Sequence, residues 1–355
     1  MCKSDRFSNV ARIRKDARPT AALNFCGIVT RTLCLFLVVF FALINPAYSQ
    51  EDQAAPTSKT RRQTIVPFQP LRQEGSSLLN GMVITVGIER ADEKEEGRLR
   101  LLVDTGASGC ALKEAATKRF KTFKELPIKE GRVGRHKFKR AVLFDIVLLG
   151  TLRVGDVPFA VVPDKVFSES SPVLKDVDGV LGRNLLERFA VLLDFKQSAI
   201  TFFAYGKLDE NERQLQGFQG DVGFAALYPV DHGLYAVPAS QKVPGITGDV
   251  LLLLDTGATL TYFEVPLGNR QGFTKIESEP IYTRTMDGVT HKLHRVSAEK
   301  IRFGTLALKE PSYYITDNYQ NLDDVSGTLG LDVLSSFRVL MDFPSQRMYF
   351  KYPEQ

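Results

Sequence analysis

The sequence predicts an all-β protein built from two related, mostly β lobes with short helices, and three observations lead to this prediction. The chain has 355 residues, which is more than one hydrophobic core usually serves. Its apolar segments are short, β-rich runs separated by turn residues. One series of landmarks occurs twice, in the same order and with nearly the same spacing.

Each repeat begins with a glycine-led strand and runs to an Asp-Thr-Gly-Ala sequence. Gly81 precedes Asp104, and Gly233 precedes Asp255 at nearly the same separation. A Gly-x-Leu-Gly element then follows each aspartate, again at nearly the same separation in both halves. These two elements are residues 179–182 and 327–330. In both halves a short helical segment and an apolar strand ending in Asp-Phe come next. Four landmarks matched in order favour a duplicated lobe over generic strand and turn signals.

Most of the remaining elements are expected to be strands. β-rich or continuous apolar runs mark residues 141–149, 159–162 and 250–254, and each half closes with a strand, at 199–203 and 347–350. Short helices are expected at 113–119 and after each Gly-x-Leu-Gly element, around Leu185 and Val333. Residues 206–220 are polar and break the pattern, so the boundary between the lobes belongs there.

The N-terminal residues have the features of an export signal. Arg31 precedes an unbroken apolar run at 33–44, and residues 47–49 give the small-x-small pattern that signal peptidase reads. The run is short for a membrane span, although an uncleaved anchor is the alternative. Because the segment before the run is long, a true start near Val29 is a second alternative. We expect the mature chain to begin near Gln50 and to be periplasmic or secreted, which N-terminal sequencing of the native protein would test.

We therefore divide the chain into five segments. Residues 1–49 are the signal peptide, 50–77 a linker or propeptide-like tail, 78–205 the N-terminal lobe, 206–220 the inter-lobe linker and 221–355 the C-terminal lobe. The tail is rich in Gln, Pro, Arg and Ser and lacks periodicity. Cys2, Cys26 and Cys34 fall in the removable part, so the mature chain cannot form an internal disulfide. The remaining Cys110 is expected to be a small buried apolar side chain.

Charge and histidine placement argue against several other classes of protein. The formal net charge is +5, but residues 1–32 alone hold seven Lys or Arg against two Asp. The short basic run at 132–140 is interpreted as a solvated hairpin, so no nucleic-acid partner is expected. His291 and His294 lie three residues apart in an expected strand and face opposite sides, so no metal site is expected there. No cofactor motif is present.

The two Asp-Thr-Gly sequences carry the chemistry. Glycine permits a tight turn that brings backbone amides to the carboxylate, and threonine can hydrogen-bond to the partner loop. One such loop is weak evidence, but two in matching repeats place Asp104 and Asp255 face to face at a pseudo-twofold axis. Two carboxyl groups at close range share one proton, so one serves as a base for water and the other as an acid toward a carbonyl.

These repeats resemble the aspartic peptidases, the pepsin and retropepsin superfamily, over about residues 79–352. The first loop and the helix behind it are especially similar to the compact retropepsin-like lobes of bacterial proteins. The resemblance implies the acid-protease fold with a cleft between two lobes, and metal-free hydrolysis of peptide bonds by activated water. It makes Asp104 and Asp255 the catalytic dyad, and it gives roles in supporting the loops to Thr105, Gly106, Ala107, Thr256, Gly257 and Ala258.

The chain departs from the pepsin pattern in several details. The candidate flap of the first lobe, residues 131–138, has no Tyr, and Thr328 replaces the larger Val180 of the first repeat. The chain also lacks Trp. Gly134 and Asp287 lie at similar offsets past the aspartates of their repeats, in two hairpins that are candidate flaps. Ordinary surface hairpins are the alternative interpretation.

The predicted function is an exported aspartic endopeptidase that acts on polypeptides. The alternative is an exported peptide-binding or scaffolding protein that retains the fold with little hydrolysis, and the intact aspartates in both repeats count against it. Because one chain supplies both aspartates, a monomer is expected to be active. Ala107 and Ala258 stand where many pepsin-like enzymes carry a Ser or Thr hydroxyl, so we expect a mildly acidic pH optimum.

Overall fold

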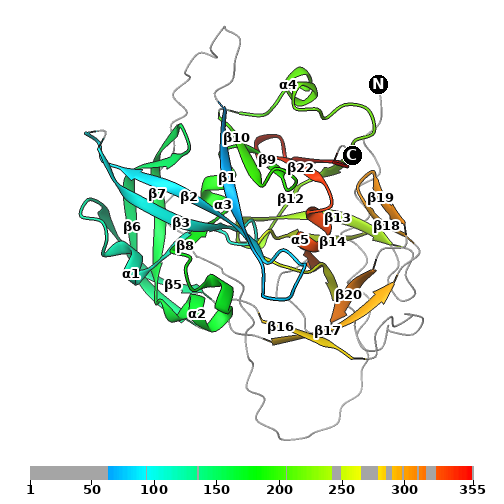
Figure 1. The fold of residues 1–355 in the computed structure, drawn as a ribbon, viewed down its shortest axis with the longest axis horizontal. Helices are drawn as coiled ribbons and strands as arrows, with labels where there is room; N and C mark the ends of the chain where they lie inside the picture. The colour runs from blue at the N-terminus through cyan, green and yellow to red at the C-terminus, as the bar shows by residue number, and fades with distance from the viewer. Residues whose placement is uncertain are drawn as a thin grey trace, which may run out of the picture. The chain divides into compact units, whose positions relative to one another are not determined.

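The fold is mostly β, as predicted, with its strands gathered into two sheets (Figure 1). The computed structural model describes residues 63–92, 94–133, 136–204, 206–241, 249–264, 279–284, 290–297, 300–309, 312–316 and 325–353. Within these residues, thirteen strands form one sheet and ten form the other. All described residues lie in one compact unit of the chain.

The larger sheet contains the strands of the first half of the chain and three strands of the second half. In spatial order its strands are β11 (Gly223–Ala226), β23 (Arg347–Lys351), β22 (Arg338–Asp342), β9 (Ala190–Asp194), β10 (Ala199–Phe203), β1 (Gln63–Leu71), β2 (Gly81–Glu89), β3 (Glu95–Val103), β8 (Gly179–Leu181), β4 (Cys110–Lys113), β7 (Leu152–Val162), β6 (His136–Leu149) and β5 (Lys124–Val133).

The smaller sheet is built only from the second half of the chain. Its path runs through β16 (Ile281–Arg284), β17 (Thr290–Ser297), β20 (Ser312–Thr316), β15 (Tyr262–Glu264), β21 (Val325–Leu329), β14 (Asp249–Leu254), β13 (Leu234–Gln241), β18 (Lys300–Phe303) and β19 (Leu306–Lys309), with β12 (Tyr228–Val230) paired to β13.

The helices are short and lie between strands. They are α1 (Glu114–Thr117), α2 (Lys165–Ser170), α3 (Arg183–Leu186), α4 (Glu210–Leu215) and α5 (Leu331–Leu334), with 3₁₀ turns at Pro172–Leu174, Asp231–Gly233 and Phe343–Ser345. The helices predicted near Lys113 and after both Gly-x-Leu-Gly elements are confirmed as α1, α3 and α5. No helix in the described ranges is long and apolar enough to cross a membrane.

The two halves of the chain meet where β9 pairs antiparallel with β22. These strands occupy equivalent places in the two repeats. Leu192 lies opposite its own equivalent, Leu340, and Val191 and Leu193 lie opposite Met341 and Val339. Antiparallel pairing of equivalent residues places a local twofold axis between Leu192 and Leu340. The duplication predicted from sequence is therefore expressed as pseudo-symmetry in the sheet.

Each repeat also has the same arrangement of strands around its Asp-Thr-Gly loop. β3 runs parallel to β8, and β4 returns antiparallel to the other side of β8. In the second half β14 runs parallel to β21, and β15 pairs antiparallel with it. Because β3 and β14 are buried at their C-terminal ends, both loops begin inside the protein.

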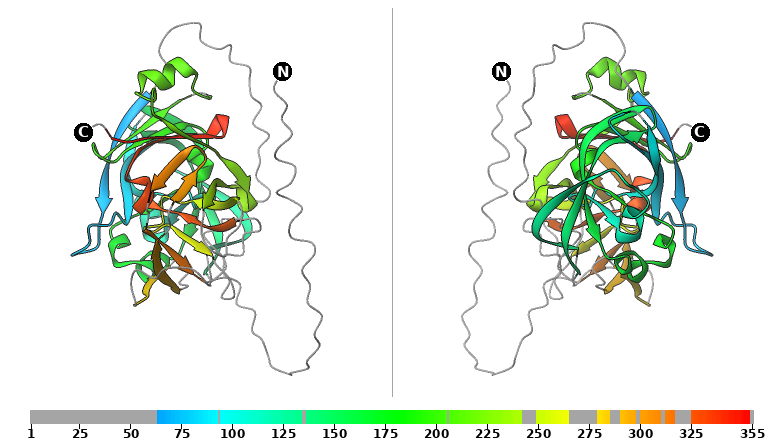
Figure 2. Two further views of the ribbon diagram at one scale, coloured as in Figure 1. Left: turned by 90° about the vertical axis from the view of Figure 1, so that its right-hand side faces the viewer. Right: turned by 90° about the vertical axis from the view of Figure 1, so that its left-hand side faces the viewer.

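The predicted linker at 50–77 needs one correction, because residues 63–71 form β1, which pairs with β10 on one side and β2 on the other (Figure 2). Thr64, Val66 and Phe68 are buried and alternate with exposed residues, which is the period of a half-buried strand. The pattern is hard to see in the sequence because Thr64 points inward whereas Ile65 is 64% exposed. Residues 50–62 lie outside the described residues.

The predicted inter-lobe linker, residues 206–220, carries a helix of its own. α4 stands outside the two sheets (Figure 2) and has no buried residue. Asp209 caps it, accepting a hydrogen bond from the Glu212 amide at 2.8 Å while the Glu212 carboxylate accepts one from the Asp209 amide at 2.9 Å. This reciprocal cap explains why a polar segment is helical without contributing to the core.

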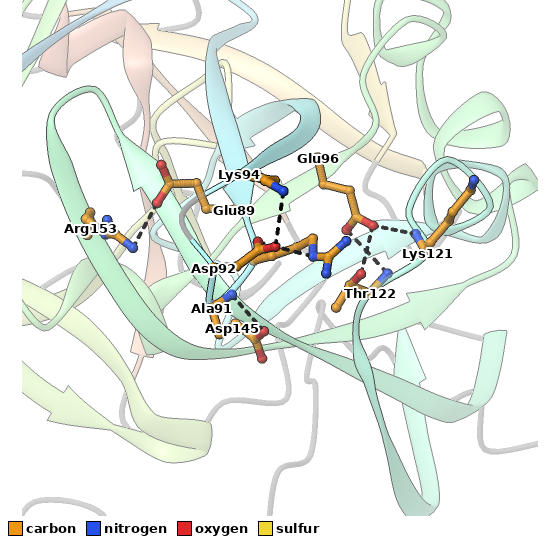
Figure 3. A network of polar contacts seen from close by, with 10 residues as sticks. Glu89, Ala91, Asp92, Lys94, Glu96, Lys121, Thr122, Asp145 and Arg153 are labelled. Carbon is orange, nitrogen blue, oxygen red and sulfur yellow. Dashed lines mark hydrogen bonds and ion pairs between the residues drawn. The ribbon is translucent and has the colours of Figure 1, made fainter.

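Polar contacts hold the turn between β2 and β3 against its neighbours (Figure 3). Glu96 accepts hydrogen bonds from the Lys121 amide at 3.0 Å and from the Thr122 hydroxyl at 2.9 Å. Glu89 forms an ion pair with Arg153 at 3.2 Å. The Arg153 side chain is 40% exposed and the Glu89 side chain only 14%, so the ion pair fixes the hairpin from its edge.

The basic run at 132–140 is a hairpin, as predicted. In it β5 pairs with β6, with Gly131 opposite Phe138 and Arg132 opposite Lys137. The side chains of Arg132 and Lys137 are 46% and 54% exposed, and both approach the Glu130 carboxylate. The charged face of this hairpin is therefore solvated. The proposed hairpin tips, Gly134 and Asp287, lie outside the described residues, as does the predicted signal peptide.

Candidate active site

The two Asp-Thr-Gly loops are positioned by the parallel strand pairs. The Asp104 amide donates to the Leu181 carbonyl at 3.1 Å, at the end of the β3–β8 pair. The Asp255 amide donates to the Leu329 carbonyl, also at 3.1 Å, at the end of the β14–β21 pair. The apolar Gly-x-Leu-Gly element of each repeat therefore fixes the point at which its aspartate leaves the sheet.

Backbone amides of each loop bind the carboxylate of that loop, as predicted for a glycine turn. The Gly106 amide donates to Asp104 Oδ1 at 2.9 Å. In the second loop the amides of Gly257 and Ala258 both donate to Asp255 Oδ1, at 2.8 and 3.1 Å. Each carboxylate is thus oriented before any ligand binds.

The two carboxyl groups face one another across the loops. A Cβ atom added to Gly106 would lie 2.5 Å from Asp255 Cγ, and one added to Gly257 would lie 2.6 Å from Asp104 Cγ. Each glycine thus lies directly beneath the opposite carboxyl group, at a distance that excludes any side chain. The aspartates are 6% and 7% exposed, so the pair is largely shielded from water.

The two threonines cross-link the loops through a reciprocal set of hydrogen bonds. The Thr105 amide donates to Thr256 Oγ1 at 3.0 Å, and the Thr256 amide donates to Thr105 Oγ1 at 3.0 Å. The Thr105 hydroxyl donates to the Leu254 carbonyl at 2.8 Å, and the Thr256 hydroxyl donates to the Val103 carbonyl at 2.9 Å. These four buried bonds hold the aspartates in register, which is the role predicted for threonine.

Burial raises the pKa of both carboxyl groups. For Asp104 burial is the largest cause, and the negative charge of Asp255 raises its pKa further, to well above the ordinary range. The pKa of Asp255 is also raised by burial, but hydrogen bonds from Gly257 and from Asp104 oppose the rise. The pair therefore holds one shared proton over a range of pH in which isolated carboxyl groups are ionised.

Ala107 and Ala258 present only methyl groups beside the carboxyl groups. Ala107 is fully buried in an apolar cluster that includes Phe138 of the β5–β6 hairpin. The alanine carbonyls accept hydrogen bonds from the first residues of the following helices, Arg183 at 2.8 Å and Leu331 at 2.9 Å. These bonds anchor α3 and α5 beneath the two loops.

Behind the first loop, Cys110 and Asn184 form hydrogen bonds that support it. Cys110 is fully buried, as predicted, and burial raises the pKa of its thiol to about 12. Its Sγ accepts a hydrogen bond from the Gly182 amide at 3.3 Å, and its amide donates to Asn184 Oδ1 at 2.9 Å. The thiol therefore has a structural role rather than that of a nucleophile.

Behind the second loop, Thr261 and Asp332 occupy the equivalent places. Thr261 Oγ1 accepts from the Gly330 amide at 2.9 Å, and the Thr261 amide donates to Asp332 Oδ1 at 2.8 Å. The Thr261 hydroxyl also donates to Asp332 Oδ1 at 2.6 Å. The carboxylate of Asp332 thus supports the second loop, whereas the side-chain amide of Asn184 supports the first. Burial raises the pKa of Asp332.

Sequence reasoning missed Asn184, Thr261 and Asp332. A signal for them existed, because Cys110 and Thr261 both lie six residues past an aspartate, and Asn184 and Asp332 both follow the last glycine of Gly-x-Leu-Gly by two residues. All eight predicted loop residues come together in one place. The two histidines do not join them: His291 is buried on β17 and His294 is half-buried.

The chain is similar to one protein family over part of its length and to several solved structures over most of it. A family model described as aspartyl protease matches residues 242–333, the part that contains the second Asp-Thr-Gly loop. No curated protein matches the chain. Conglutin gamma, a basic 7S globulin from lupine seeds, is 12% identical with a TM-score of 0.52, and the match covers 83% of this chain and 96% of that one.

Two further solved structures are similar. The basic 7S globulin from soybean is 12% identical with a TM-score of 0.50, over 82% of this chain and 97% of that one. An aspartic proteinase from Irpex lacteus is 15% identical with a TM-score of 0.44, over 82% of this chain and 98% of that one. The chain has the two-lobed, pepsin-like aspartic peptidase fold, and the resemblance predicted from its sequence is confirmed.

Proposed function

We propose that the chain is an aspartic endopeptidase that hydrolyses peptide bonds with Asp104 and Asp255. The observation that carries this proposal is the facing pair of buried carboxyl groups, each oriented by its own loop and held opposite the other by the threonine cross-link. A buried pair of this kind costs stability, which a purely structural lobe has no reason to keep.

The proposed reaction uses one shared proton. Ionised Asp255 removes a proton from a water molecule, whose oxygen attacks the carbonyl carbon of the peptide, while protonated Asp104 donates its proton to the carbonyl oxygen. The resulting tetrahedral diol collapses when Asp255 returns a proton to the amide nitrogen and Asp104 recovers one from a diol hydroxyl. The C–N bond then breaks, releasing an acid and an amine, and the dyad regains its starting proton.

The second candidate is a peptide-binding or scaffolding protein with this fold. It is favoured by the similarity to two proteins whose names describe them as basic 7S globulins rather than proteinases. Fold alone does not decide between binding and hydrolysis. Digestion of a peptide library by the purified mature chain separates the two candidates, because a binding protein would leave every peptide intact.

The pH dependence follows from the two alanines. Neither Ala107 nor Ala258 can donate a hydroxyl hydrogen bond to an aspartate, and such a bond would stabilise the charged form and lower the pKa. The singly protonated dyad should persist toward neutrality, so we expect a pH–rate maximum at about pH 5–6.5. Ala107→Ser or Ala258→Ser should move the profile toward acid. A wild-type maximum below about pH 3.5, or a double Ser variant with an unmoved profile, would contradict this.

We also propose that one chain is a complete enzyme, because both aspartates and both threonines of the cross-link come from the same polypeptide. Specific activity should stay constant when the protein is diluted through the nanomolar range. Retropepsins with one lobe per chain lose activity on dilution because their dyad is divided between subunits. A steep loss on dilution, reversed by concentrating the sample, would show that a second chain is needed.

A further inference from the structure

A pocket of about 340 Å³ lies where the end of β1, the turn between β9 and β10, and α5 meet. This volume is in the range of small-molecule sites, about 300–1,000 Å³. Among the described residues that line it, none belongs to either Asp-Thr-Gly-Ala loop. The pocket is therefore separate from the proposed catalytic dyad.

The pocket combines an aromatic lining with positive charge. Phe68, Phe195 and Phe337 contribute rings, and Phe68 meets Phe195 edge to face with ring centroids 6.1 Å apart. Arg72 and Lys196 are exposed and also line the pocket. The Arg72 guanidinium donates to the carbonyl oxygen of Ser77, a neutral partner that leaves its positive charge in place. Rings beside a guanidinium suit an apolar ligand that carries a carboxylate.

Hydrogen bonds connect two walls of the pocket to the residues that follow Asp255. Asp332 lines the pocket, and its Oδ1 accepts the hydrogen bonds from Thr261 that support this loop. Leu79, another lining residue, precedes Asn80, whose Nδ2 donates to Thr259 Oγ1 at 3.2 Å. A ligand that moves either wall would therefore move residues within six positions of Asp255.

We propose that this pocket is an effector site for a small carboxylate with an apolar body, which acts on the Asp255 loop through α5. The carboxylate binds Arg72, and the apolar body packs against the rings of Phe195 and Phe337. The binding part of this proposal is independent of the proposed peptidase function, whereas the effect on hydrolysis rests on it.

The binding test uses a fluorescent reporter. The chain has no Trp, so Phe195→Trp places a single fluorophore in the pocket. Titration with 3-phenylpropionate should give a saturable change with a Kd on the order of 0.1–1 mM, a range set by the small number of ligand atoms. The neutral amide, 3-phenylpropanamide, should bind at least about fivefold more weakly because it lacks the charge that Arg72 recognises.

Arg72→Met is the matched control, because it keeps most of the side-chain length and lies on the surface. It should weaken binding of the acid to the level of the amide and leave binding of the amide unchanged. An unsaturable signal, equal binding of acid and amide, or no effect of Arg72→Met would overturn the site. A peptide acid, N-acetyl-Gly-Phe, identifies the source of the carboxylate: tighter binding than 3-phenylpropionate indicates a peptide C-terminus, and weaker binding indicates a free acid.

Coupling to the loop is tested without hydrolysis. In the Asp104→Asn variant, binding should persist, and saturating 3-phenylpropionate should change amide hydrogen exchange at residues 255–261 by at least about twofold. In the wild type the same ligand should change kcat with little change in KM. Binding without any change in exchange would overturn the effector role, whereas a change in exchange in a protein that hydrolyses no peptide would overturn only the peptidase function.

Discussion

Asp104→Asn and Asp255→Asn are each expected to lower kcat for peptide hydrolysis by at least about 10³-fold, because neither variant can share a proton between two carboxyl groups. The asparagine amide keeps the shape of the side chain, so the backbone hydrogen bonds of the loops should hold the fold. The measurement is the rate of cleavage of a peptide that the wild type cleaves. Asp92→Asn, at an exposed position away from the loops, is the matched control.

These variants should also change stability with pH in a defined direction. The folded pKa of Asp104 is raised by burial and by Asp255, so the folded protein holds this proton to higher pH than the unfolded chain does. Its contribution to stability is fully present below the unfolded pKa, about 3.9, and is lost as pH rises through the folded pKa. The asparagine of the Asp104→Asn variant cannot ionise, so the Tm of this variant should equal or exceed that of the wild type at about pH 8.

Near-full peptide hydrolysis by either Asn variant would refute the proposal that Asp104 and Asp255 act together as a catalytic dyad.

Thr256→Val is expected to lower both stability and activity. Valine has nearly the same shape, but it removes the hydroxyl that donates to the Val103 carbonyl and accepts from the Thr105 amide. Both partners remain buried, and each unsatisfied group costs about 1–3 kcal/mol. We expect the free energy of unfolding, measured by urea denaturation, to fall by about 2–5 kcal/mol. We expect kcat to fall at least about tenfold, because the Asp255 loop loses its register with the Asp104 loop.

Thr256→Ser is the control for this variant, since it keeps the hydroxyl and removes only a methyl group. It should retain most of the activity. Thr105→Val should resemble Thr256→Val because the four hydrogen bonds are reciprocal, and the double variant should cost less than the sum of the two single variants. Equal stability of the Val and Ser variants would mean that the cross-link does not hold the loops together.

The duplicated lobe was predictable from the sequence because its markers are local. An apolar strand before Asp-Thr-Gly, a turn glycine and a short helix after Gly-x-Leu-Gly each record backbone preferences of a few consecutive residues. Recurrence of these markers at matching intervals then predicted both repeats. The alternating burial of β1 was missed because polar Thr64 is buried while apolar Ile65 is exposed, which hides the alternation in the sequence. Composition alone therefore made residues 63–71 resemble the tail that precedes them.

The sequence by itself thus determined the all-β lobes, the eight loop residues and the use of threonine as the cross-link. Only the tertiary structure decided that Thr261 and Asp332 support one loop while Cys110 and Asn184 support the other. It also decided that both catalytic carboxyl groups are buried, which raises the pKa of each. The physical reason is that these properties depend on burial and on contacts between residues far apart in the chain. Thr261 and Asp332 are 71 residues apart, and Cys110 and Asn184 are 74 apart, so these contacts form only when each half of the chain folds.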